Sequence, residues 1–474
     1  MARDLRSLFD AQRAAFRREG TPDYRERVRR LNALLDGMQA YQEDLVRSIS
    51  EDFGNRAAQE TRMLEIFPTV DEIRHTRGHL KRWMKPRRVS ANWQFATGSG
   101  RIIYQPLGVV GVIGAWNYQL LLVLSPLVNA LAAGNRVMIK PSEMAPRTAE
   151  LMGKMIAERF KPEEVTVLTG DAEVSAAFAA LPFDHLIFTG STRVGKLVMR
   201  AASENLTPVT LELGGKSPAI VHADYPIEKA AERILTGKFW NAGQTCIAPD
   251  YVMVPETRLE DFMRAAEAIL PARFRKVVDN PDYTRIVNVR FYERLVGMIE
   301  EAREKGGRVL QSNPANEDCN VDNRVVPPTV VANATDDMQI MQEEIFGPIL
   351  PVITYRELDD AIRYVNDRPR PLALYYFDSN KARISRVLNE TTSGGATIND
   401  CIFHIAQHNL PFGGVGPSGM GAYHGFDGFV TFSKKKGVFI QGIGGQFLFP
   451  NFLSPPYSRF ADWLIKVLIW NRKH

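Results

Sequence analysis

The sequence Gly108-Val-Val-Gly-Val-Ile-Gly114 decides the fold class. Its continuous apolar and β-branched character is typical of a parallel strand that is buried on both faces. The further strands that we expect lie at 136–140, 165–168, 185–188, 209–213 and 219–221. Segments with helical periodicity, for instance 147–160 and 171–180, separate most of these strands. The alternation predicts an α/β fold with a doubly wound, Rossmann-like parallel sheet.

The segments before this strand are helical in period, with apolar positions every three or four residues over 25–47 and 60–83. Residues 101–105 alternate like a strand with one exposed face. The most apolar run, 120–133, contains Pro126 and falls short of the roughly 20 residues that a membrane span needs. We therefore expect it to form a buried helix of a large domain.

A second series of helix and strand patterns begins after Gly214-Gly215, with a helix over 227–239, and continues to about Thr397. We interpret it as a second α/β domain. The tail is different, because the basic run Lys434-Lys435-Lys436 is followed by glycines, prolines and an amphipathic segment, 459–473. That segment is too short and too charged to span a bilayer. It could lie in a membrane interface, but we favour a helix that packs across a dimer or over the substrate mouth.

Neither the charge nor the cysteines indicate a nucleic-acid surface, a disulfide framework or a metal site. Residues 1–100 hold 19 of the basic and 14 of the acidic side chains, which leaves 40 of each for the rest of a chain with net charge +5. The basic residues of 25–30 and 81–88 alternate with acidic and apolar ones, so we interpret them as solvated helix faces and not as a nucleic-acid surface. The charged first ten residues are unlike a secretory signal. Because three cysteines are too few for a disulfide framework or a thiolate metal site, we expect a reducing, cytoplasmic location.

A glycine loop offers a place for a phosphate. The fingerprint G-x-G-x-x-G is missing, because Gly108, Gly111 and Gly114 are spaced three apart. The sequence Phe188-Thr-Gly-Ser-Thr-Arg-Val-Gly195 instead lies between an expected strand and a helix over 196–202. The backbone N–H groups at that helix start, with the Ser191 hydroxyl, could receive a pyrophosphate. Taken alone, the loop is also compatible with an ordinary strand-to-helix turn.

Three single side chains could carry chemistry. Cys246, in Asn241-Ala-Gly-Gln-Thr-Cys-Ile-Ala248, has small and polar neighbours, and a following helix would lower its pKa, so a nucleophilic thiolate competes with a buried small hydrophobe. Glu212 is an acid inside an apolar strand, either a general base with a raised pKa or a carboxylate that caps the Gly214-Gly215 turn. Asn117 directly follows an expected strand and could stabilise an oxyanion or cap the next helix. Local sequence leaves these alternatives open.

Taken together and in this order, the motifs resemble those of the aldehyde dehydrogenase superfamily, and they cover essentially the whole chain up to about Ser433. The sequences Asn117-Tyr118-Gln119 and Gly419-Met-Gly-Ala-Tyr-His-Gly425 are similar to the class 3 branch, which includes fatty, aromatic and coniferyl aldehyde dehydrogenases. The seven motifs are Ala115-Trp-Asn117, Lys140-Pro-Ser-Glu143, Phe188-Thr-Gly-Ser191, Leu211-Glu-Leu-Gly-Gly-Lys216, Gly243-Gln-Thr-Cys246, Glu343-Glu-Ile-Phe-Gly-Pro348 and Leu410-Pro-Phe-Gly-Gly414.

The resemblance implies a mechanism with named residues. Cys246 would attack the aldehyde carbon, the Asn117 amide and the backbone N–H of Cys246 would hold the oxyanion, and hydride would pass to a nicotinamide. Water activated by Glu212 would then hydrolyse the thioester. The resemblance also implies that Glu344 holds the nicotinamide ribose and that Phe346 packs beside the ring. The remaining cofactor-binding residues that it implies are Trp116, Lys140, Glu143, Gly190, Ser191, Thr192, Arg193, Val194 and Gly195.

By the same resemblance, Lys140 and Glu143 meet the adenosine ribose. Glu143 would accept hydrogen bonds from a free 2′-hydroxyl and repel a 2′-phosphate. We therefore expect NAD as the cofactor, although this branch often accepts NADP as well, and we expect no metal.

The family architecture implies a cofactor-binding domain over 1–86 and 106–210 and a catalytic domain over 211–432. Bridging segments over 87–105 and 433–446 and a tail over 447–474 complete it. The bridging segments would pair subunits by sheet extension, and the alternating strand 101–105 fits an exposed edge that awaits a partner. We therefore expect a homodimer.

The sequence leaves two substrate classes and two other functions to be weighed. A coniferyl-type aromatic aldehyde is our first expectation for the substrate, and a medium- or long-chain aliphatic aldehyde is the second. A catalytically silent scaffold of the same fold would lack the cysteine or the base, but Cys246 and Glu212 both stand in their motifs. Release of the thioester to coenzyme A is disfavoured because Glu212 can activate water.

Overall fold

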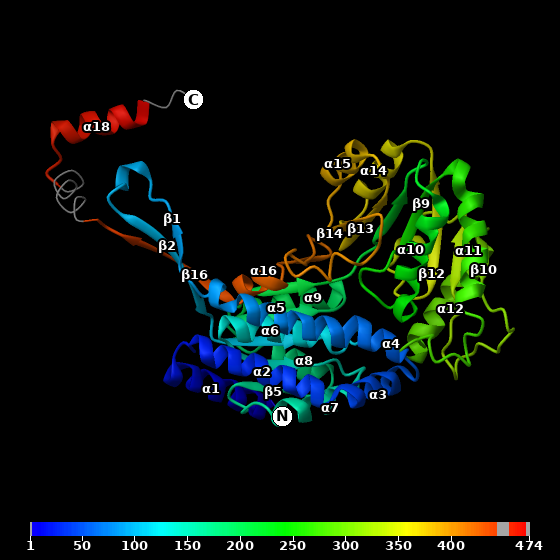
Figure 1. The fold of residues 1–474 in the computed structure, drawn as a ribbon, viewed down its shortest axis with the longest axis horizontal. Coiled ribbons are helices and arrows are strands. Elements are labelled where there is room, and N and C mark those ends of the chain that lie inside the picture. The colour runs from blue at the N-terminus through cyan, green and yellow to red at the C-terminus, as the bar shows by residue number, and fades with distance from the viewer. Residues whose placement is uncertain (1, 443–454, 471–474) are drawn as a thin grey trace.

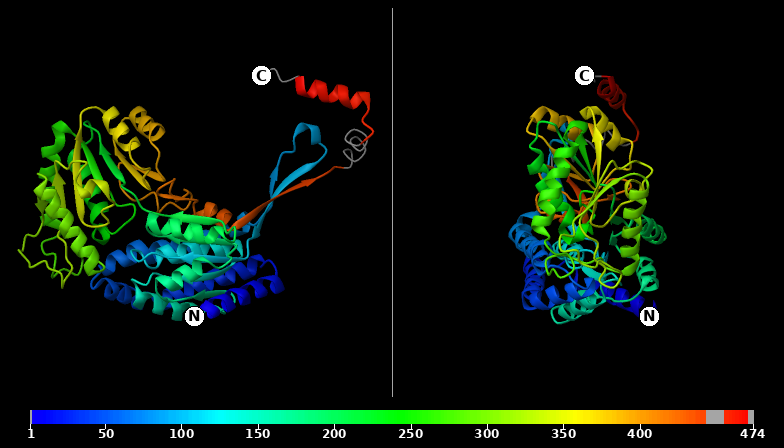
Figure 2. Two further views of the ribbon diagram at one scale, coloured as in Figure 1. Left: turned by 180° about the vertical axis from the view of Figure 1, so that it is seen from behind. Right: turned by 90° about the vertical axis from the view of Figure 1, so that its right-hand side faces the viewer.

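The computed structural model describes residues 2–442 and 455–470. Within them, the strands form three sheets, of six, seven and three strands. In Figure 1, the six-stranded sheet and its helices form the base of the molecule, the seven-stranded sheet lies at the right, and the three-stranded sheet is an arm at the upper left. The two views of Figure 2 show the same parts from behind and from one side. The expected α/β fold class is confirmed.

The six-stranded sheet is doubly wound. In spatial order its strands are β15 (Gly419–Met420), β7 (Val209–Glu212), β6 (His185–Thr189), β3 (Val109–Ile113), β4 (Arg136–Lys140) and β5 (Val165–Val167). The helices between them are α6 (Leu121–Ala133), α7 (Pro146–Ala157), α8 (Ala172–Ala179) and α9 (Thr192–Ser203). On β3, Val109 and Ile113 face a cluster with residues of α8 and α9, whereas Val110 and Val112 face a cluster with α6. Helices therefore cover both faces of the central strand, as its continuous apolar sequence predicts.

The N-terminal helices extend these two helical layers. They are α1 (Ala2–Glu19), α2 (Tyr24–Ala40), α3 (Gln42–Phe53), α4 (Ala58–Thr61), the π-helical η1 (Arg62–Ile66) and α5 (Phe67–Trp83). On α1, Leu5 and Phe9 are buried, and the Phe9 ring lies 5.5 Å from the ring of Phe183. α6 is buried at every residue and packs against α2 and α5. This confirms the prediction of a buried helix over 120–133.

Two arginines of α2 are buried, which corrects the prediction of a solvated face over 25–30. Arg27 and Arg30 are only 2% and 3% exposed. Arg27 donates hydrogen bonds to the carbonyl oxygens of Pro22 and Ala132, at 3.0 and 2.9 Å. The carbonyls in the last turn of a helix have no partner within it. Arg27 is buried because it satisfies such a carbonyl at the end of α6.

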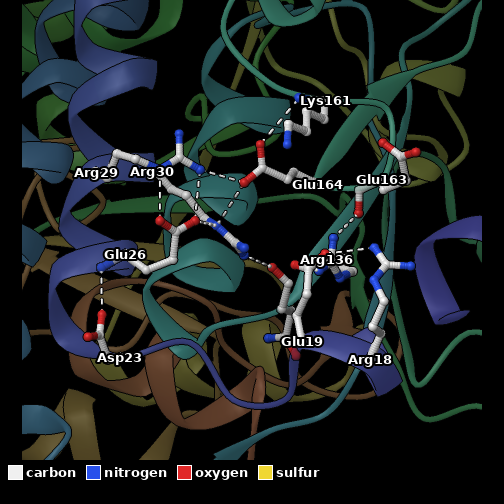
Figure 3. A network of polar contacts seen from close by, with 11 residues as sticks. Arg18, Glu19, Asp23, Glu26, Arg29, Arg30, Arg136, Lys161, Glu163 and Glu164 are labelled. Atoms are coloured by element: carbon white, nitrogen blue, oxygen red, sulfur yellow. Dashed lines mark hydrogen bonds and ion pairs between the residues drawn. The ribbon is translucent and has the colours of Figure 1, made fainter. Parts of the chain in front are cut away.

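Figure 3 shows the network of ion pairs that continues from Arg30. Its Nε lies 2.8 Å from Glu26 Oε1 and 3.4 Å from Glu164 Oε1. Arg29 reaches the same two carboxylates at 2.7 and 2.5 Å, and Arg136 pairs with Glu19 at the end of α1. The network therefore ties α1 and α2 to the segments that flank β4 and β5.

Replacing Arg30 with methionine is expected to lower the free energy of unfolding by about 2 kcal/mol at pH 7, because two carboxylates lose one of their counter-charges while Arg29 remains. The hydrogen bonds from Arg29 and Arg30 lower the pKa of Glu26 to about 2. This contribution is fully present above pH 4.5 and is lost as the pH falls toward 2, so the effect of the variant should shrink over that range. Thermal unfolding of Arg30→Met at pH 7 and pH 3, with the exposed Arg6→Met as control, measures it. An equal loss at both pH values would contradict this account.

The seven-stranded sheet forms the second α/β unit and is parallel except for the edge strand β10. In spatial order its strands are β10 (Arg308–Gln311), β11 (Thr329–Ala332), β12 (Ile349–Tyr355), β9 (Tyr251–Pro255), β8 (Pro218–Val221), β13 (Ala373–Phe377) and β14 (Gly395–Ile398). Its helices are α10 (Ile227–Phe239), η3 (Trp240–Gly243), η4 (Glu256–Arg258), α11 (Leu259–Arg273), α12 (Val289–Glu304), α13 (Gln339–Gln342), α14 (Leu358–Asn366) and α15 (Lys381–Glu390).

The chain returns to the six-stranded sheet before residue 432, where we placed the end of the catalytic domain. β15 pairs with β7, and α16 (Gly425–Thr431) packs against α5 and α6. The driving force is burial, because Phe429 and Phe432 are both fully buried in the core that contains α6. Residues 419–432 thus belong with the six-stranded sheet and its helices, and not with the seven-stranded sheet.

The arm is an antiparallel sheet in which β2 (Ser99–Pro106) lies between β1 (Arg87–Val89) and β16 (Ser433–Ile440), with η2 (Trp93–Phe95) at its tip. The expectation that 101–105 forms an open edge strand is wrong, because β2 pairs with a strand on each side and β1 and β16 form the edges. The last helix, α18 (Arg459–Trp470), lies beyond the arm and apart from the two larger sheets (Figure 1). It coincides with most of the amphipathic segment 459–473. Residues 443–446 of the expected bridge, and 447–454 and 471–474 of the expected tail, lie outside the described residues. No described helix is long and apolar enough to cross a membrane.

Candidate active site

The residues singled out in the sequence gather where the parallel strands of the first sheet end. Asn117 follows β3, Lys140 ends β4, Ser191 follows β6 and Glu212 ends β7. Ligands of open α/β sheets bind outside the carboxyl ends of the strands. The segment with Cys246 reaches this edge from the second unit, since the Asn117 amide donates a 3.2 Å hydrogen bond to the carbonyl of Gln244.

A tight reversal of the backbone places Cys246. Asn241, Ala242 and Gly243 all have positive φ, at 54°, 50° and 73°. A Cβ on Gly243 would lie 2.1 Å from the carbonyl oxygen of Gly347, so only glycine allows this approach. Three consecutive residues in the left-handed conformation are energetically costly. They bring the cysteine segment against the loop that holds Glu344 and Phe346.

Cys246 is half-buried, and its thiol is protonated at neutral pH. Burial, followed by the nearby carboxyls of Glu344 and Glu212, raises the pKa of Cys246 to about 12. The expectation of a following helix that would lower this pKa is wrong, because a turn leads from Cys246 to β9. A helix N-terminus can lower a thiol pKa only where it points at the sulfur. The nucleophile therefore has to lose a proton during the reaction.

Glu212 is a buried carboxyl without a hydrogen bond. It is 2% exposed, and neither carboxyl oxygen has a partner among the described residues. Burial raises the pKa of Glu212 well above its ordinary value. The alternative that it caps the Gly214-Gly215 turn is wrong, since a cap would accept hydrogen bonds from the turn. A buried, unpaired acid with a raised pKa suits a general base.

Asn117 is held as part of the site and does not cap a helix. It is 2% exposed, and α6 begins only at Leu121 with Leu120 in the capping position, so the N-cap alternative is wrong. The carbonyl of Asn117 accepts hydrogen bonds from Asn241 Nδ2 at 3.0 Å and from Arg56 Nη1 at 3.2 Å. These bonds aim its amide at the cysteine segment.

Sequence reasoning missed the residues that support Asn117 and the cysteine segment. Arg56 and Glu65 form a fully buried ion pair, and Glu65 Oε2 accepts the backbone N–H of Leu120 at 2.7 Å. Glu60 accepts the backbone N–H of Asn241 at 2.8 Å, and burial raises its pKa to about 7. Glu60 and Glu65 stand in an ordinary amphipathic sequence, and Arg56 lies in the short segment between α3 and α4, so only the tertiary contacts distinguish them.

The residues expected at the adenosine end of the cofactor site lie at the carboxyl edge of the first sheet. Lys140 is buried, donates to the carbonyl of Pro141 at 2.7 Å and lies 3.9 Å from Glu143 Oε2. Ser191 caps α9 by accepting the N–H of Val194 at 3.4 Å, and Thr192 donates to the carbonyl of Pro417 at 3.1 Å. The helix begins at Thr192 and not at 196 as expected, so Gly190, Ser191 and the first turn of α9 present a helix N-terminus at the sheet edge.

The residues expected at the nicotinamide end combine an aromatic cluster with a buried acid. Trp116 lies with its ring 5.4 Å from the rings of Phe346 and Phe291. Glu344 packs so closely on Gly214 that a Cβ there would lie 2.2 Å from its carboxylate. Burial raises the pKa of Glu344 to about 7, and its Oε1 has no partner among the described residues. In the described part of the chain, no three His, Cys, Asp or Glu residues could hold a metal.

Comparisons with known proteins agree with this geometry. The model of the aldehyde dehydrogenase family matches residues 1–438. The chain belongs to this family. This aldehyde dehydrogenase is 51% identical to a Pseudomonas aeruginosa protein named probable coniferyl aldehyde dehydrogenase, over 97% of this chain and 95% of the relative.

Solved aldehyde dehydrogenases have the same fold. The substrate-bound state of AldH from Staphylococcus aureus has a TM-score of 0.91 and 39% identity, covering 98% of this chain and 99% of that chain. An aldehyde dehydrogenase of Mycobacterium tuberculosis complexed with NAD⁺ has a TM-score of 0.83 and 28% identity, covering 92% of this chain and 90% of that chain. The protein is accordingly an NAD(P)-dependent aldehyde dehydrogenase, which confirms the family prediction made from its motifs.

Proposed function

We propose that this aldehyde dehydrogenase oxidises a coniferyl-type aromatic aldehyde to its carboxylic acid, with Cys246 as nucleophile, Asn117 as oxyanion ligand and Glu212 as base. The observation that carries the mechanism is the meeting of a half-buried thiol, a buried amide and a buried unpaired carboxyl at one sheet edge. The substrate class is supported by the name of the Pseudomonas aeruginosa relative. A medium- or long-chain aliphatic aldehyde is the alternative.

The first steps form and oxidise a thiohemiacetal. Cys246 gives its proton to a solvent water and its sulfur bonds to the aldehyde carbon, while the C=O π electrons move to the carbonyl oxygen, which becomes an oxyanion. The Asn117 amide and the backbone N–H of Cys246 stabilise that charge. Bound NAD(P) supplies the acceptor for the hydride that leaves the same carbon. A thioester on Cys246 remains.

The last step needs water and a base. Glu212, once ionised, takes a proton from water, whose oxygen attacks the thioester carbon and displaces the Cys246 sulfur. The acid is released and the thiol is restored. Because Glu212 has no competing hydrogen bond from any described residue, its carboxylate is free to bind that water. This role also disfavours release to coenzyme A.

The residues fit a nicotinamide dinucleotide. Glu344 has a buried oxygen that no described residue bonds, as expected of an acceptor for ribose hydroxyls, and the Trp116–Phe346 pair offers an apolar wall. Glu143, with its side chain 46% exposed, would accept a free 2′-hydroxyl and repel a 2′-phosphate. We therefore propose NAD as the preferred cofactor, with NADP as a second.

Three further proposals concern the organisation of the protein. The cofactor-binding part would comprise 1–86 and 106–212 together with 419–432, since β7 ends at Glu212, and the catalytic part would comprise 213–418. The arm and the tail would join two copies of the chain into a homodimer, since β1 presents an unpaired edge and every one of its residues is exposed. The location would be cytoplasmic, in keeping with three free cysteines.

Coniferaldehyde is expected to be oxidised with at least about tenfold higher kcat/KM than decanal, a difference of about 1.4 kcal/mol in transition-state binding. Purified protein is assayed for NADH formation with coniferaldehyde, benzaldehyde, hexanal and decanal, and the same panel is repeated with NADP. A rate on decanal far above that on coniferaldehyde would overturn the proposed substrate class and support the aliphatic alternative.

A further inference from the structure

Lys238 is a charged side chain on the buried face of α10. It lies near the end of α10, in the same apolar stripe as Ala231, Ile234 and Leu235. The residue is 0% exposed, and its Nζ has no hydrogen-bond partner among the described residues. A buried ammonium without a hydrogen bond is costly. The helix would pack at least as well with an apolar residue there, so packing does not account for Lys238.

The carboxylate that pairs with Lys238 belongs to Asp250, which also pairs with a second lysine. Lys238 Nζ lies 3.9 Å from Asp250 Oδ1, and the other oxygen of Asp250 lies 2.5 Å from Lys216 Nζ. Asp250 Oδ1 also accepts the backbone N–H of Ile345 at 3.1 Å. Two lysines and the peptide next to Glu344 therefore meet at one carboxylate.

The same charges hold the main chain on both sides of Glu344. Lys216 donates to the carbonyl of Glu343 at 2.9 Å. Arg294 donates to the carbonyls of Glu344 and Ile345 at 2.5 and 2.9 Å. Three carbonyls of this loop thus accept hydrogen bonds from charged side chains, while one buried oxygen of the Glu344 side chain has no partner among the described residues.

The charge of Lys238 bears on the ionisation of Glu344. Burial and Asp250 raise the pKa of Glu344 to about 7, against the opposing charges of Lys216 and Arg294. Burial lowers the pKa of Lys238 to about 8, against the attraction of Asp250 and Glu344. Each group is most stable as an ion when the other is one. A charged Lys238 therefore favours an ionised Glu344.

We infer that Lys238 is a positioning residue whose ammonium keeps Glu344 an ionised acceptor for the ribose hydroxyls of the nicotinamide nucleotide, on a loop that Asp250 and Lys216 hold in place. The inference rests on the proposed role of Glu344. An ionised carboxyl can accept from two hydroxyls, whereas a protonated one has to donate with one oxygen. Lys216 and Asp250 each follow a proposed catalytic residue, Glu212 and Cys246, by four positions. The cluster thus links the base, the nucleophile and the cofactor loop.

Lys238→Met tests this inference with the full-length protein. We expect the Kd for NADH, followed by nucleotide fluorescence, to rise about tenfold or more, because a charged hydrogen-bond acceptor is lost. The KM for NAD should rise with it, while the KM for the aldehyde stays within about twofold. The thermal midpoint should be unchanged or higher, because methionine removes a buried charge that has no hydrogen bond, while Asp250 keeps its ion pair with Lys216. Lys229→Met, on the exposed face of the same helix, should behave as the wild type.

A double-mutant cycle tests whether Lys238 acts through Glu344. In a Glu344→Gln background, Lys238→Met should weaken NADH binding by less than about twofold further. Additive effects, wild-type NADH affinity in Lys238→Met, or a lowered midpoint with all kinetic constants falling in parallel would each overturn the inference. A wild-type protein that binds neither NADH nor NADPH would instead contradict the proposed cofactor site.

Discussion

Cys246→Ala is expected to lower aldehyde oxidation by at least about 10³-fold, because removal of a covalent nucleophile forces the reaction onto an uncatalysed path. The protein should remain folded, since Cys246 is half-buried and its side chain packs only at the margin of the core. It should also bind NADH as the wild type does. The rate of NADH formation with coniferaldehyde and the thermal midpoint measure these two expectations separately.

Cys319→Ala is the matched control for this variant. Cys319 is also half-buried, and burial raises its pKa to about 11. It lies in the second unit, where its sulfur accepts a 3.9 Å contact from Asn313 Nδ2. We expect its activity within about twofold of the wild type. If Cys246→Ala kept more than a tenth of the wild-type rate, the thiohemiacetal mechanism would be wrong.

Much of the scaffold could be predicted because its signals are local. The strand 136–140 and the helix 227–239 have the bounds that their apolar patterns predict. The loop before α9 lies between a strand and a helix, as its glycines and Ser191 indicate. Such patterns record whether a segment is buried on one face or two, and neighbouring residues suffice to show it.

The electrostatics of the site could not be predicted in the same way. Whether a thiol pKa rises or falls depends on what surrounds it, and the chain neighbours of Cys246 indicate a helix where the structure has a turn. Arg56 supports Asn117 from 61 residues away. Lys238 interrupts an apolar stripe, which is a visible signal, but its partners Asp250 and Glu344 come from other segments. Motifs therefore locate the reactive groups, whereas tertiary contacts decide how they ionise.

Glu212→Gln is expected to lower the steady-state rate by about 10²- to 10⁴-fold, because amide nitrogen and oxygen cannot take the proton from water. The substitution is isosteric and removes a buried carboxyl without a partner. Since the pKa of Glu212 is raised, the folded state holds its proton more tightly than the unfolded chain, which lowers stability as the pH rises above the ordinary glutamate value. The variant should therefore be at least as stable as the wild type at pH 7, so unfolding cannot explain its loss of activity.

The timing of NADH release identifies the step that Glu212 serves. If it only activates water, Glu212→Gln should still form one equivalent of NADH rapidly and then stall, as the thioester on Cys246 waits for hydrolysis. The wild-type kcat should rise with pH through the raised pKa of Glu212, because only the ionised form is a base, and this rise should be absent from the variant. Rapid-mixing absorbance at several pH values measures both. Loss of the initial burst would show instead that Glu212 also takes the proton of the Cys246 thiol, whose pKa of about 12 leaves that proton in need of an acceptor.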